Sequence, residues 1–107
     1  DMTYRLEGVS LAVTARIENP GAAPMPFCFG YHPAFPWPLP DGAGRPHRIH
    51  LANGASPGHQ RLNADGQRAP DLHPSAFVDG VLTLDHALFA ADALIIPEGA
   101  GSRCWYG

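Results

Sequence analysis

The sequence predicts an all-β protein, with the short strands of a β-sandwich or a β-barrel. Residues 9–18 alternate between apolar and polar side chains, which is the pattern of a strand with one buried face. Short apolar runs recur along the chain, separated by Gly, Pro, Asn and Asp turn signals. No segment of about ten residues keeps a helical period. Residues 1–107 are therefore interpreted as one partial domain of this class.

The first predicted element is a hairpin. Its second strand covers residues 9–18, where Ala12 is the one neutral residue on the polar side. Residues 3–6 form its partner, with the turn at Glu7-Gly8. The sequence Asn19-Pro20-Gly21 predicts the end of the strand.

A second apolar run covers residues 25–31 and predicts a strand that leads to His32, although Pro26 and Gly30 interrupt it. Residues 33–46 contain five prolines, which cannot donate a hydrogen bond to a strand ladder. This stretch is therefore predicted to be a stiff loop.

The strands predicted next are short. Residues 47–51 alternate and are followed by a turn at Asn53-Gly54, and residues 55–75 are polar enough to form a long loop, with a short strand near Arg61-Leu62. A hairpin over residues 77–84 turns at Asp79-Gly80.

The final stretch combines a helical turn with two strands. Residues 85–91 favour one helical turn. Residues 94–96 predict a buried strand that ends at Pro97, and residues 102–106 begin another strand. A strand that stops among large aromatic side chains predicts a fragment of a longer protein.

Composition and charge exclude several classes of function. The formal charge is −3, and the seven basic residues, all Arg, are scattered, so a nucleic-acid partner is not expected. No apolar run approaches the roughly 20 residues that span a bilayer, so no membrane partner is expected. A soluble, cytoplasmic protein is the prediction.

Metal and disulfide chemistry find little support. The two cysteines, Cys28 and Cys104, lie far apart and outside any C-x-x-C motif, so no disulfide is indicated. The six histidines show no metal-ligand spacing, and His47 and His50 would point to opposite faces of a strand. The prediction is a protein without a metal or other cofactor.

His32 is the titratable residue most suited to catalysis. It follows an apolar run and precedes Pro33, which favours extended backbone. Aromatic neighbours, including Tyr31 and Phe35, could form a rigid wall that holds the imidazole as a general acid or base. The alternative is a buried histidine with both nitrogens hydrogen-bonded, and the rings could equally be core or loop anchors.

Other catalytic groups are less well supported. Asp85 and Asp92 flank an apolar pair, where they could be helix caps or could hydrogen-bond a sugar hydroxyl. No pair of carboxylates suited to glycoside hydrolysis stands out among the acidic residues. No serine lies in a Gly-x-Ser-x-Gly elbow, and no known phosphate-binding loop is present.

Residues 11–40, with Gly30-Tyr31-His32-Pro33-Ala34-Phe35 at their centre, resemble the aldose 1-epimerase (galactose mutarotase) family, most closely its divergent bacterial branch. Residues 84–96 are similar to that branch's next recognisable stretch. The resemblance implies a large antiparallel sandwich of the galactose mutarotase type. It implies an isomerase that interconverts the α and β anomers of a small-molecule sugar, without a cofactor.

The resemblance also implies roles for particular residues. His32 matches the histidine that protonates the ring oxygen, and Asp92, with Asp85 as second choice, matches an aspartate that binds sugar hydroxyls. Tyr31 and Phe35 are expected to contact the substrate. The glutamate that acts as base belongs to a segment beyond residue 107, so little or no turnover is expected from residues 1–107 alone.

The resemblance is incomplete, which leaves alternatives open. Pro33-Ala34-Phe35-Pro36 replaces the Ser-Tyr-Phe-Asn stretch of galactose-specific members, and that family's earlier Arg and His are absent. Galactose is therefore not assigned as the sugar. A second hypothesis is a non-catalytic carbohydrate-binding module. A third is a truncated β-domain that self-associates through open sheet edges and an exposed apolar face.

Overall fold

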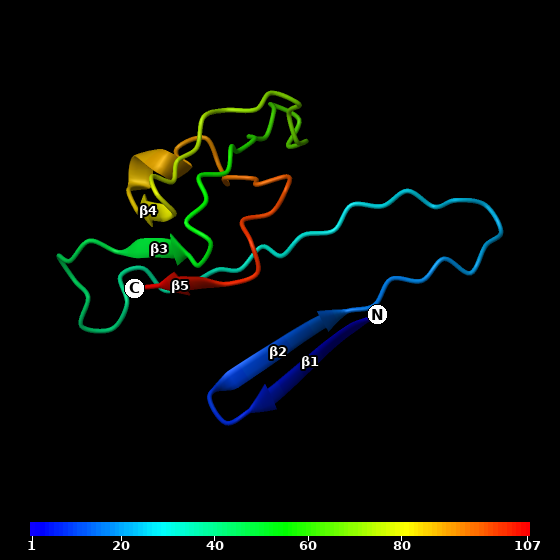
Figure 1. The fold of residues 1–107 in the computed structure, drawn as a ribbon, viewed down its shortest axis with the longest axis horizontal. Coiled ribbons are helices and arrows are strands. Elements are labelled where there is room, and N and C mark those ends of the chain that lie inside the picture. The colour runs from blue at the N-terminus through cyan, green and yellow to red at the C-terminus, as the bar shows by residue number, and fades with distance from the viewer. The chain divides into compact units, whose positions relative to one another are not determined.

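The computed structural model describes residues 1–107, which form two compact units, Asp1–Ala34 and Phe35–Gly107. The regular structure consists of five strands in two antiparallel sheets and one short 3₁₀ helix (Figure 1). The predicted all-β class is confirmed. No helix is long and apolar enough to cross a membrane.

The first unit contains the predicted N-terminal hairpin. Strand β1 (Met2–Glu7) pairs antiparallel with β2 (Ser10–Ala15), and Glu7 lies opposite Ser10. The turn therefore consists of Gly8 and the residue after it, one position later than predicted. Gly8 has a positive φ of 57°, which glycine adopts without strain.

The apolar face of this hairpin differs from the prediction because it is not buried. Leu11 and Val9 are exposed, while Val13 and Ala15 are only half-buried. The strand also ends at Ala15 rather than continuing to residue 18. Alternation shows that one face of a strand is apolar, but that face is buried only if a second layer packs against it. None of the buried hydrophobic or polar residues belongs to the first unit.

The strand predicted over residues 25–31 is wrong. This segment is an extended chain that forms no backbone–backbone hydrogen bonds and belongs to neither sheet. Pro24 and Pro26 carry no amide hydrogen, which weakens any ladder at the start of the segment. An apolar run becomes a strand only where another strand lies alongside it, and sequence pattern does not report that partner.

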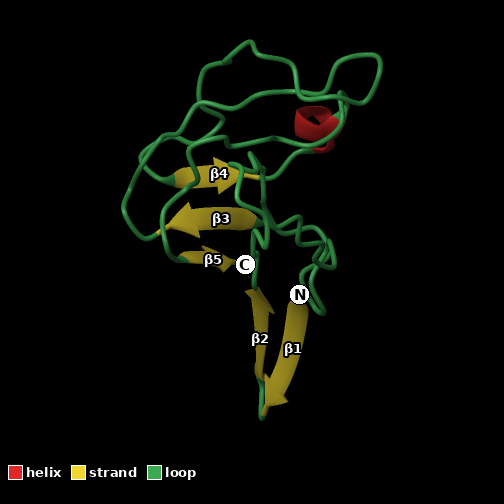
Figure 2. Cartoon of the chain, turned by 90° about the vertical axis from the view of Figure 1, so that its right-hand side faces the viewer, coloured by secondary structure: helices red, strands yellow, loops and turns green.

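The second unit is organised around a three-stranded antiparallel sheet in the order β4-β3-β5 (Figure 2). The central strand β3 (Arg48–Leu51) pairs with β4 (Val81–Thr83) on one side and with β5 (Cys104–Tyr106) on the other. All three strands fall within segments that the sequence predicts as strands.

The turn that precedes β4 is confirmed at Asp79-Gly80. Val78 and Val81 exchange two backbone hydrogen bonds of 2.9 Å, and the two residues between them have positive φ angles of 49° and 76°. A Cβ atom on Gly80 would lie 2.6 Å from the Cα atom of Gly54. Glycine is therefore required both by the backbone angle and by the close approach of another chain segment.

The predicted helical turn is the 3₁₀ helix η1 (His86–Phe89). The Oδ1 atom of Asp85 accepts a hydrogen bond from the Ala87 amide at 2.7 Å, so Asp85 is its N-cap. At the other end, the Arg61 guanidinium donates to the carbonyl oxygens of Leu88 and Asp92 at 2.8 and 3.1 Å. A side chain from the long loop therefore holds the end of this helix in place.

The buried strand predicted over residues 94–96 is wrong. Its three residues are half-buried, and only Ile95 pairs with another segment, through two backbone hydrogen bonds to Gln60. Pro97 follows directly and cannot donate to a ladder, which limits the pairing to one bridge.

The core of the second unit is small. Leu51, Phe77 and Leu82 are its buried hydrophobic residues. They are surrounded by partly buried apolar side chains from the strands, η1 and the loops: Ile49, Ala55, Ala76, Leu84, Leu88, Leu94, Ile96 and Ala100. Loops therefore supply much of the packing, as expected for a chain rich in glycine and proline.

Candidate functional site

The four residues proposed from the sequence are divided between the two units. Tyr31 and His32 belong to the first unit, and Phe35 and Asp92 belong to the second. Within the second unit, no hydrogen bond or ring contact joins Phe35 to Asp92.

His32 is exposed and forms no hydrogen bond or ion pair. The buried-histidine alternative does not apply to it, because its imidazole is open to solvent. Its neighbour Tyr31 is anchored: the Tyr31 hydroxyl donates to the Val13 carbonyl at 3.1 Å, and its ring meets Phe29 edge-on at 5.1 Å. The side chain before His32 therefore ties this part of the chain to β2.

Phe35 and Trp37 form an aromatic cluster with residues far along the chain. The Phe35 ring lies 5.4 Å from that of Tyr106, whose hydroxyl donates to the Pro36 carbonyl at 2.8 Å. The Trp37 ring stacks on His86 at 4.3 Å between centroids. Phe35 keeps an exposed face. Its ring therefore packs against Tyr106 and still has apolar surface that a ligand could contact.

Asp92 has a left-handed backbone with a φ of 67°, a conformation that aspartate adopts more readily than most residues. Its Oδ1 atom accepts a hydrogen bond from the Ala93 amide at 2.6 Å, and its carbonyl accepts from Arg61. The residue is exposed, so the carboxylate keeps capacity to accept hydrogen bonds from a ligand.

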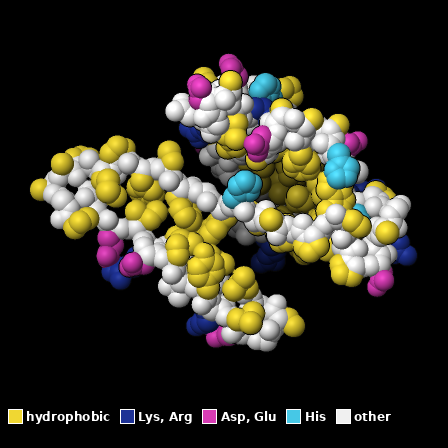
Figure 3. Space-filling model, turned by 180° about the vertical axis from the view of Figure 1, so that it is seen from behind, with side chains coloured by type: hydrophobic (Ala, Val, Ile, Leu, Met, Phe, Trp, Pro, Cys, Tyr) yellow, Lys and Arg dark blue, Asp and Glu magenta, His cyan; other side chains and the backbone are white.

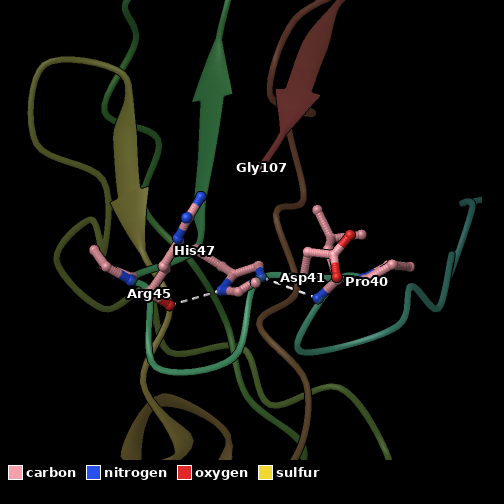
Figure 4. A pocket seen from close by; sticks show the side chains of 8 residues that line it. Pro40, Asp41, Arg45, His47 and Gly107 are labelled. Atoms are coloured by element: carbon pink, nitrogen blue, oxygen red, sulfur yellow. Dashed lines mark hydrogen bonds between the residues drawn. The ribbon is translucent and has the colours of Figure 1, made fainter.

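A cavity of about 250 Å³ lies in the second unit, between the proline-rich loop and the start of β3 (Figure 4). Leu39, Pro40 and Pro46 provide apolar surface, and Asp41 and Arg45 stand at its edge. The residue that organises it is His47, which is one of only two buried polar side chains.

His47 closes the loop through both ring nitrogens. The Leu39 amide donates to Nε2 at 3.0 Å, and Nδ1 lies 2.9 Å from the Arg45 carbonyl (Figure 4). Since an amide can only donate and a carbonyl can only accept, His47 is the neutral tautomer that carries its proton on Nδ1. Gly42 allows this arrangement, because a Cβ atom there would lie 2.7 Å from Nε2.

In the sequence, His47 stands out only as a possible metal ligand, but in the structure it has a different role. His47 and His50 do differ in exposure, buried and exposed respectively, as expected from opposite faces of a strand. The signal that could have revealed the role is local: a histidine directly before a strand, preceded by a loop of prolines and glycines whose backbone needs partners.

Two other histidines, His59 and His73, lie next to each other within the long loop. His59 and His73 form an antiparallel bridge with two backbone hydrogen bonds, and their rings stack at 5.4 Å between centroids. The Nδ1 atom of His59 is buried and has no hydrogen-bond partner. Burial lowers the pKa of His59 below its ordinary value of 6.5, and the charges of Arg61 and His73 act in the same direction, while the Pro74 carbonyl opposes them.

Because the pKa of His59 is lowered in the folded state, the free energy of unfolding should fall as the pH is lowered below 6.5. In that range His59 binds a proton more readily in the unfolded chain than in the folded one. Replacing His59 by glutamine should reduce the difference between urea midpoints measured at about pH 7.5 and about pH 5. His50→Gln, at an exposed histidine, serves as control and should keep the wild-type difference. An unchanged pH dependence in His59→Gln would contradict the assignment.

No group of three or more His, Cys, Asp or Glu side chains is arranged to hold a metal ion. Both cysteines are free thiols and are exposed. Comparison with protein families, with curated proteins and with solved structures found no match to this chain.

Proposed function

We propose that this chain contributes the general acid of an aldose 1-epimerase-type reaction, with His32 as that acid. The observation that carries the proposal is the exposed, unpartnered imidazole of His32 within Gly30-Tyr31-His32-Pro33-Ala34-Phe35, the segment that resembles the mutarotase family. A galactose mutarotase-like sandwich for the complete protein, and a cytoplasmic location in which Cys28 and Cys104 stay reduced, belong to the same proposal.

The proposed chemistry balances without a cofactor. His32 donates a proton to the ring oxygen of the sugar while a base removes the proton of the anomeric hydroxyl, and the bond between C1 and the ring oxygen breaks. Rotation about the C1–C2 bond and the reverse proton transfers then close the other anomer. An imidazole suits both directions because its ordinary pKa lies near neutral pH.

The remaining proposed residues bind the sugar. The exposed carboxylate of Asp92 would accept hydrogen bonds from sugar hydroxyls. Phe35 would pack against the C–H face of the ring, and Tyr31, whose hydroxyl already donates to Val13, would offer its ring rather than its hydroxyl.

Polarimetry of freshly dissolved α-glucose and α-galactose tests the proposal directly. Residues 1–107 are expected to give little or no acceleration, since no carboxylate contacts His32. In a polypeptide that also carries the base, His32→Ala should lower the rate by a factor of about 10² or more. His50→Ala, at another exposed histidine, should keep the rate. Equal rates for the wild type and His32→Ala would remove His32 from the mechanism.

A non-catalytic carbohydrate-binding module is the second candidate, and the exposed ring of Phe35 favours it. Trp37 lies beside this part of the chain and is half-buried, so its fluorescence should respond to a bound sugar. Sugar binding that is lost in Phe35→Ala, together with no turnover in any longer polypeptide, would favour this candidate over the enzyme.

A further inference from the structure

The β1–β2 hairpin has one face that is apolar throughout. Asp1 and Arg16 exchange two backbone hydrogen bonds, so the next pair, Met2 with Ala15, and every second pair after it are non-hydrogen-bonded pairs, whose side chains lie closer together. The hairpin's apolar face consists of three such pairs: Met2 with Ala15, Tyr4 with Val13, and Leu6 with Leu11. The opposite face carries Thr3 with Thr14, Arg5 with Ala12, and Glu7 with Ser10.

This face is largely open to solvent. Tyr4, Leu6 and Leu11 are 67, 73 and 61 % exposed. Together with Met2 they present a contiguous apolar surface on the order of 400 Å², which is the size of the largest apolar patch on many soluble monomers, and such patches are often functional. A two-stranded hairpin without a covered face is marginally stable in water, so covering this face would stabilise the whole unit.

The segment over residues 25–31 carries further exposed apolar side chains. The hydrogen bond from the Tyr31 hydroxyl to the outward-facing carbonyl of Val13 joins it to the free edge of β2. Met25, Phe27 and Phe29 are exposed at every second position. Hydrophobic side chains are conspicuous over the hairpin and this segment in the space-filling view (Figure 3). A standard interface buries roughly 800 Å² of each partner, so the hairpin's apolar face supplies about half of that area.

The distribution of charge on the hairpin favours a second copy of the chain as the partner that covers the apolar face. The hairpin's charged side chains, Arg5 and Glu7, lie on the opposite face and pair with each other at 3.4 Å. Two copies of the apolar face can therefore meet without removing any charge from water. An apolar face that meets its own copy about a two-fold axis is self-complementary, and such an interface closes at two chains.

We propose that the hairpin's apolar face is the interface between two copies of this chain. Sedimentation velocity over a series of concentrations should show a species of twice the 11.4 kDa chain mass. A wild-type chain that stays monomeric throughout the series would overturn the proposal, and would mean that another part of the chain covers the face. Aggregates without a distinct dimer would overturn it as well.

A pair of matched variants locates the interface. Leu6→Lys with Leu11→Glu replaces one cross-strand pair of the apolar face by an opposite-charge pair that retains cross-strand attraction. It should weaken self-association about tenfold or more. The control, Thr3→Lys with Thr14→Glu, places the same charges on the opposite face and should dimerise like the wild type. Equal dimerisation of the two variants would place the interface elsewhere.

Photo-crosslinking separates lost association from lost folding. A photo-reactive amino acid in place of Tyr4, on the apolar face, should yield a covalent dimer upon irradiation. The same group in place of Thr3, on the opposite face, should yield little. Equal yields from both positions would contradict the proposal, whatever the folding of the charged variants.

Discussion

Replacing Leu82 by alanine is expected to lower the free energy of unfolding of residues 35–107 by about 2–5 kcal/mol. Leu82 is 3 % exposed and is one of three buried hydrophobic residues in the unit. Its removal leaves a cavity in the middle of β4, opposite Ile49 of the central strand. Because the core is so small, that loss is a large share of the 5–15 kcal/mol that stabilises a typical domain.

Urea denaturation followed by circular dichroism measures this effect. Leu72→Ala makes the same chemical change at a side chain that is 66 % exposed, and its effect should stay within about 0.5 kcal/mol. The difference between the two variants reports burial alone. Equal losses in Leu72→Ala and Leu82→Ala would show that Leu82 does not lie in a packed core.

Replacing His47 by phenylalanine is the second change with a large expected effect. The ring can still occupy the site, but the Leu39 amide and the Arg45 carbonyl lose their partners. Leaving such groups unpaired costs about 1–3 kcal/mol each where they are buried. His47 also joins the loop to the sheet, because its carbonyl accepts from the Leu84 amide at 2.9 Å. The proline-rich loop and its cavity should therefore loosen together.

Two measurements distinguish loosening of the loop from global unfolding. The urea midpoint gives the stability of the whole unit, and hydrogen exchange at the Leu39 amide reports the loop itself. His50→Phe, at an exposed histidine of the adjoining strand β3, should leave both unchanged. Slow exchange at Leu39 in His47→Phe would show that Nε2 is not the partner of that amide.

Elements specified by neighbouring residues were predicted well. The hairpin turn at Asp79-Gly80 needs two positive φ angles, which Asp and Gly adopt readily, and the structure confirms it. Asp85 caps the helical turn by accepting a hydrogen bond from the Ala87 amide, which lies only two residues along the chain. In each case the information lies within a few residues, so sequence pattern is sufficient.

Elements that depend on distant partners were predicted poorly. The apolar runs over residues 25–31 and 94–96 have strand-like composition, yet the first has no strand beside it and the second makes one bridge. The alternation over residues 9–18 identified an apolar face correctly, but its exposure could not be foreseen. Periodicity indicates which side chains share a face of a strand, but it does not indicate which part of the chain packs against that face.

For the candidate site, the residue types can be read directly from the sequence: an imidazole before a proline at His32, aromatic rings near it in the chain, and turn-forming aspartates. Their surroundings depend on contacts with distant parts of the chain. The tertiary structure left His32 exposed and buried His47, which became the support of a cavity. The physical reason is that a histidine's role depends on which groups meet its two nitrogens, and at His47 one of those groups, the Leu39 amide, lies eight residues away.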